Sequence, residues 1–73
     1  MARAVVIGES SRVAGFALAG AVVCAAEDEA AVRSAWGSLP SDAEVVIVTA
    51  RAAGWLGAEL AGRPGVLPVV MPG

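Results

Sequence analysis

The chain has 73 residues, of which 58% are hydrophobic, and its formal net charge at pH 7 is −2. Its five basic residues are all arginines scattered along the sequence, whereas binding to nucleic acid or an anionic membrane surface requires a basic patch. A chain of this length forms one small domain, and we expect no nucleic-acid partner.

Four short runs rich in valine, isoleucine and leucine predict four strands, over residues 3–7, 21–26, 44–49 and 66–71. The runs lack polar alternation, and alanine-rich segments long enough for helices separate them. This pattern is typical of strands that are buried on both faces of a parallel sheet.

The first strand ends at Gly8, which suits a tight turn into a helix. Ser10 and Ser11 are favoured N-cap residues for that helix, which we expect over residues 12–19. Gly20 is placed to end it.

Three acidic residues, Glu27, Asp28 and Glu29, mark the start of a second helix, where they interact favourably with the positive end of its dipole. Pro40 stops this helix. Its inner side is expected to carry Ala31, Val32, Ala35, Trp36 and Leu39.

A third helix is expected over residues 50–62, and its inner side should carry Ala52, Leu56 and either Glu59 or Leu60. Gly54 and Gly57 each cost this helix about 1 kcal/mol relative to alanine. In the last strand, Pro68 cannot donate to a sheet, so we expect either an edge position for this strand or a break near its start.

We predict an α/β fold, a flavodoxin/receiver-like three-layer domain over residues 1–73, with a four-stranded parallel sheet in the order 2-1-3-4 and three helices. Right-handed crossovers then place the first helix on one face and the other two on the opposite face. A fourth helix following Gly73 would cover the remaining gap. Without that helix, we expect the fragment to self-associate.

Residues 13–26, the longest nearly uncharged stretch, are fewer than the roughly 20 apolar residues that span a bilayer, and they contain two glycines. We expect no membrane insertion, no signal peptide and a cytoplasmic location. The single cysteine, Cys24, is interpreted as a small buried core residue.

The chain has no lysine, histidine or tyrosine, which excludes Schiff-base chemistry, a phosphate-loop lysine and the commonest general base. One cysteine cannot form a zinc site. The segment from Gly8 to Ser11 lies where doubly wound folds bind ligands, but it lacks the glycine-rich dinucleotide pattern. Thr49 ends the third strand where a receiver domain needs an aspartate. We predict no catalytic residues, no metal and no cofactor.

Four segments carry a family resemblance: residues 4–9 (AVVIGE), 15–21 (GFALAGA), 46–49 (VIVT) and 67–73 (LPVVMPG). They resemble the F subunit of the archaeal and bacterial V-type (A-type) ATP synthases. The resemblance covers essentially the whole chain in order and approximate spacing. Family members usually continue past the proline and glycine pair into a C-terminal helix, which this sequence, ending at Gly73, lacks.

The resemblance implies a non-catalytic, Rossmann-like rotor subunit of the central stalk. Such a subunit binds the coiled-coil D subunit and helps to couple ATP hydrolysis or synthesis to proton or sodium transport, at the membrane periphery. The alternative is a small flavodoxin-like ligand-binding or regulatory module that uses the loop after the first strand.

The best docking surfaces are the loops at the carboxyl ends of the strands and the weakly covered face near the first helix. Phe16 has a competing interpretation as a core residue, and the two tryptophans are more typical of packing than of stacking platforms. The candidate partner-binding residues are Glu9, Arg12, Phe16, Glu27, Arg51 and Trp55.

Overall fold

The computed structural model describes residues 3–72, apart from the side chains of residues 17–19. Over these residues, four strands alternate with three α-helices, two of which continue as 3-10 helices. The strands are β1 (Arg3–Gly8), β2 (Val22–Ala25), β3 (Ala43–Val48) and β4 (Leu67–Val70). The helices are α1 (Ser10–Val13) followed by η1 (Ala14–Ala19), α2 (Glu29–Gly37), and α3 (Ala50–Leu56) followed by η2 (Gly57–Ala61).

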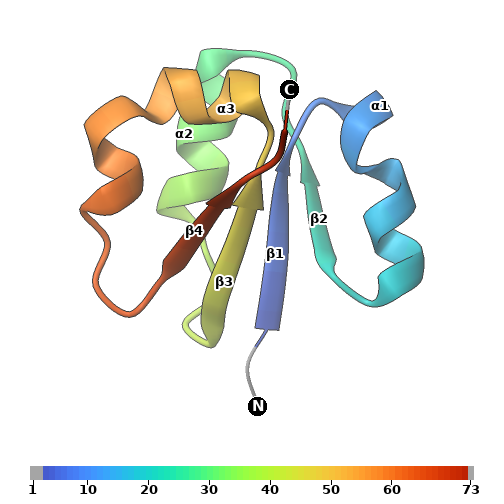
Figure 1. Ribbon diagram of the computed structural model, residues 1–73, viewed down its shortest axis with the longest axis horizontal. Coiled ribbons are helices and arrows are strands. Elements are labelled where there is room, and N and C mark those ends of the chain that lie inside the picture. The colour runs from blue at the N-terminus through green and yellow to red at the C-terminus, as the bar shows by residue number, and fades with distance from the viewer. Residues whose placement is uncertain (1–2, 73) are drawn as a thin grey trace.

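All neighbouring strands are parallel, and their order is β2-β1-β3-β4. Figure 1 shows α1 on one side of the sheet and α2 and α3 on the other. The predicted α/β fold, with its strand order and its three helices, is therefore confirmed. So is the prediction that one face of the sheet has a single helix as its cover.

The main core lies between the sheet and the pair α2 and α3. Alternate residues of a strand point to opposite faces, so one side of the two central strands enters this core. These strand residues join buried side chains of both helices. The members of the cluster from the central strands and the helices are Val5, Ile7, Ala43, Val46, Val48, Val32, Trp36, Ala52 and Leu56. Trp36, 7% exposed, is the packing residue that its helical spacing predicted.

A smaller apolar contact lies under α1 on the opposite face. Val6 points to this face and is fully buried, as is Val13 of α1. α1 packs on β1 and β2, and η1 packs on β2. The prediction that Cys24 is a buried core residue is only partly correct. Cys24 lies on an edge strand and packs against the main core, but it is half-buried.

The first and third helices differ from the single α-helices that the sequence predicted. The first is α-helical only as far as Val13, its N-cap is Glu9 rather than a serine, and it continues as a 3-10 helix to a turn at Gly20, whose φ is 84°. The third ends at Leu56 because Gly57 has φ 54°, a left-handed value that cannot continue a right-handed α-helix.

β4 is an edge strand, as its proline predicted. The N–H of Met71, just after the strand, donates to the carbonyl of Val48 in β3 at 2.8 Å. Because successive backbone groups of a strand alternate in direction, the nitrogen of Pro68 points away from β3. The proline therefore removes no hydrogen bond from the sheet.

Candidate functional site

The carboxyl ends of β1 and β3 lie where the strand order reverses, which is the position at which doubly wound sheets bind ligands. The two strand ends approach each other closely here. A Cβ atom added to Gly8 would lie 2.2 Å from Cγ2 of Thr49, so no residue with a side chain fits at position 8 without displacement. We call the residues around this point the carboxyl rim: Glu9, Ser10, Arg12, Glu27, Thr49, Arg51 and Trp55.

Thr49 connects the loop after β1 with the loop after β3 at the carboxyl rim. It is the N-cap of α3, it is 1% exposed, and its Oγ1 accepts the N–H of Ala52 at 3.3 Å. The same hydroxyl donates to Oε1 of Glu9 at 2.5 Å. Both hydrogen-bonding functions of the buried hydroxyl are therefore used within the protein.

This hydrogen bond also favours the ionised form of the Glu9 carboxyl. It lowers the pKa of the Glu9 carboxyl below its ordinary value. The backbone N–H of Glu9 and the positive charges of Arg51 and Arg12 act in the same direction, against a smaller effect of burial. Glu9 is therefore a fixed carboxylate at neutral pH and not a poised acid or base.

Glu27 lies at the start of α1 and not, as predicted, in the first turn of the following helix. Its Oε2 accepts the backbone N–H of Ser10 at 2.9 Å. This N–H, with the Ser10 hydroxyl, lowers the pKa of Glu27, although the nearby negative charge of Glu9 opposes the shift. The other two residues of the acidic run have the predicted interaction with the start of α2. Asp28 caps this helix by accepting the N–H of Ala31, and Glu29 lies in its first turn.

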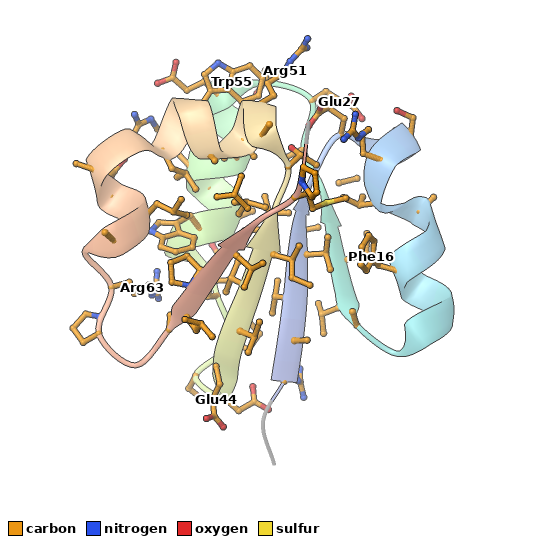
Figure 2. All side chains as sticks on the ribbon, in the orientation of Figure 1. Phe16, Glu27, Glu44, Arg51, Trp55 and Arg63 are labelled. Carbon is orange, nitrogen blue, oxygen red and sulfur yellow. The ribbon has the colours of Figure 1, made fainter. Side chains whose placement is uncertain are left out.

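Two arginines complete the carboxyl rim. Nη2 of Arg12 donates to the carbonyl of Pro72 at 3.2 Å, which ties the start of α1 to the segment after β4. The guanidinium of Arg51 lies 5.9 Å from the centroid of the Trp55 ring, within the range of a cation–π contact. Figure 2 shows Glu27, Arg51 and Trp55 at the same end of the molecule.

The structure thus brings together five of the six predicted partner-binding residues, Phe16 being the exception. Figure 2 places Phe16 lower down, beside β2 and the first helical segment, away from the labelled rim residues. It is half-buried, which agrees with its competing interpretation as a packing residue. Spacing along the sequence could not separate it from the rim, because its position depends on the turn of a helix that becomes 3-10.

A second cluster, which the sequence did not predict, lies between α2 and the turn before β4. Nη1 of Arg63 donates to the carbonyl of Trp36 at 2.5 Å, and its guanidinium lies 5.8 Å from the indole centroid. A pocket of about 410 Å³ opens beside them, and it is lined by Trp36, Glu59, Gly62, Arg63 and Pro64. Because the Arg63 guanidinium is hydrogen-bonded to the end of α2, the cluster is explained as a structural contact between this helix and the turn before β4.

Among the described residues, no group of three or more histidine, cysteine, aspartate or glutamate side chains is placed to hold a metal ion. None of the helices in residues 3–72 is long and apolar enough to cross a membrane. No protein-family model matches the chain, and no curated protein matches it. The resemblance to rotor subunits rests on the four sequence segments.

Proposed function

We propose that the domain is the globular head of a non-catalytic rotor subunit of a V-type (A-type) ATP synthase, and that its carboxyl rim docks on the coiled-coil D subunit. Through this contact it contributes to coupling ATP hydrolysis or synthesis with proton or sodium transport. One observation carries the proposal. At the position where folds of this kind bind small ligands, the chain's own Glu27 and Glu9 accept hydrogen bonds from the Ser10 N–H and the Thr49 hydroxyl.

The alternative, a small ligand-binding module, requires an anion at the start of α1. Such an anion would have to displace the Glu27 carboxylate from the Ser10 N–H. It would also meet the negative charge of Glu9, which its hydrogen bond and nearby arginines keep ionised. The two carboxylates at the start of α1 therefore oppose a phosphate or nucleotide there, which supports the docking function.

The composition of the rim suits a protein contact. Arg51 and Trp55 form a cation–π pair at the surface, and tryptophan and arginine are the residue types that contribute most to binding energy at interfaces. Glu27 and Arg12 add exposed charges of both signs. Coiled-coil surfaces carry alternating charges at the positions beside their apolar seam, so a mixed-charge rim can recognise them.

The proposal is tested by co-expressing the protein from its complete gene with the D subunit encoded in the same genome. A complex in size-exclusion chromatography with light scattering is expected. Arg51→Glu should weaken it by at least about tenfold, because it removes the cation–π contact and reverses one rim charge. Arg3→Glu is the matched control, because Arg3 pairs with Asp42 at the opposite end of the sheet. Absence of the complex would overturn the assignment.

The ligand-binding alternative has its own measurement. Trp55 reports on the rim because its ring lies beside Arg51. Titration with inorganic phosphate and with ATP, up to millimolar concentration, should leave the tryptophan fluorescence unchanged. A saturable change that disappears in Arg51→Glu would favour the ligand-binding module over the rotor subunit.

A further inference from the structure

Within residues 3–72, no helix lies over half of the sheet face that carries α1. α1 and η1 pack on β1 and β2, and Figure 1 shows α1 beside β2, with β4 away from it. Strand register and alternation place a group of apolar side chains on the uncovered half, which we call the bare lane: Ala4, Val45, Ile47, Leu67 and Val69. Leu67 is 61% exposed and Val69 is 41% exposed.

The helical segment next to the bare lane is apolar in sequence all the way round. Residues 13–19 are successive apolar residues, and no charged residue occurs between positions 13 and 26. A helix that is hydrophobic on every side is characteristically a buried helix. Of the described residues of this segment, Val13 is buried against the sheet, whereas Ala14 and Gly15 are exposed.

We propose that the domain forms a two-fold dimer in which the α1 and η1 segment of each copy lies on the bare lane of the other. The two surfaces lie side by side on one face of the molecule, so a two-fold axis parallel to the strands exchanges them. Each sheet then gains a second helix on this face. The inference concerns the domain by itself and does not rest on the rotor assignment.

Charge and size both favour a second copy as the occupant. Neither the bare lane nor residues 13–19 carry a charge, so their contact leaves no ion without a partner. The lane lies mainly over the adjacent strands β3 and β4, which together are about 10 Å wide, the diameter of one helix. The two equivalent contacts together bury on the order of 1,000 Å², the lower limit for a specific interface. We therefore expect a weak, reversible dimer.

Sedimentation velocity, from about 1 μM to about 1 mM protein, measures this equilibrium. Ala14→Glu changes the outer side of the helical segment, and Val69→Lys changes the bare lane. Each should weaken dimerisation at least about tenfold, because a charge would be buried without a partner. Ala58→Glu is the control for the first, because Ala58 is also exposed but lies on η2, remote from the interface.

Val70→Lys is the control for the second variant. Val70 follows Val69 in the same strand and is 48% exposed, but its side chain points to the opposite face of the sheet. Circular dichroism and thermal unfolding check that every variant folds. If Val69→Lys does not fold, Leu67→Lys tests the same surface at a more exposed position.

The reciprocal geometry has a sharper test. In an equimolar mixture of Ala14→Glu and Val69→Lys, one contact of the mixed dimer is unchanged and the other pairs the new glutamate with the new lysine. We expect the mixture to dimerise although neither variant does so alone. A wild-type chain that stays monomeric at about 1 mM, a dimer that survives both variants, or controls that disrupt it equally would each overturn the proposal.

Discussion

The hydroxyl of Thr49 donates a hydrogen bond of 2.5 Å to the carboxylate of Glu9, and it thereby joins the carboxyl ends of the two central strands. The two residues are 40 positions apart in the sequence. The same hydroxyl caps α3, so a single buried group holds a loop, a helix end and a carboxylate in place.

Replacing this hydroxyl should lower the stability of the fold. Thr49→Val removes the N-cap of α3 and the hydrogen bond to Glu9, and we expect a loss of about 1–2 kcal/mol in the free energy of unfolding. Thr49→Ser retains the hydroxyl and should recover most of the loss. Urea denaturation at pH 7 measures both. Equal stability of the valine and serine variants would contradict the role assigned to the hydroxyl.

The lowered pKa of Glu9 predicts a dependence of stability on pH. Its carboxylate is stabilised in the folded state, so its contribution is fully present above the unfolded pKa of about 4.3 and is lost as the pH falls through the folded pKa. The difference in unfolding free energy between the wild type and Glu9→Gln should therefore be largest near neutral pH and should shrink below pH 4. Urea titrations across this range measure it. A difference that grows in acid would have the wrong sign.

Gly8→Ala should be strongly destabilising, because the new methyl group would lie 2.2 Å from a carbon of Thr49. We expect a loss of about 1–3 kcal/mol from the displacement of packed backbone and side chain. Gly54→Ala is the matched control. Gly54 lies within α3 with open space around it, so there alanine should stabilise by about 0.5–1 kcal/mol. Thermal and urea unfolding compare the two variants.

The position of the proline in β4 predicts a contrast between two neighbouring variants. Pro68→Val should change the unfolding free energy little, because the nitrogen at position 68 points away from β3. Val69→Pro places the missing N–H on the side that faces β3 and should cost about 1–3 kcal/mol, because a β3 carbonyl loses its hydrogen-bond donor. Urea denaturation of both variants tests the direction of the strand. Similar losses would show that the assigned alternation is wrong.

Much of the fold could be predicted because it depends on local patterns. Apolar runs predicted the four strands. The rule of right-handed crossovers predicted that a single helix would cover one face of the sheet. The breaks within the first and third helices were not foreseen. Gly57 was recognised as a weak point, but the sequence does not show whether a glycine in a helix adopts a positive φ, because neighbouring packing decides it.

The rim was predicted in part for a related reason. Strand order alone brings the residues after β1, β2 and β3 to adjacent positions, so a contact of Glu9 with Thr49, or of Glu27 with Ser10, could have been anticipated. Glu27 was assigned instead to the helix that follows it in the chain. Local rules favour the nearest helix end, whereas the parallel sheet places the end of α1 within reach of this carboxylate.

The two rim bonds link segments that are 17 and 40 residues apart, so neither can form until the strands beneath them have paired. Contacts of this kind contribute little to the transition state for folding and act mainly against unfolding. The carboxyl rim should therefore set the lifetime of the folded domain more than the speed at which it forms. Glu9→Ala, which leaves the Thr49 cap of α3 in place, should accelerate unfolding while leaving the refolding rate almost unchanged.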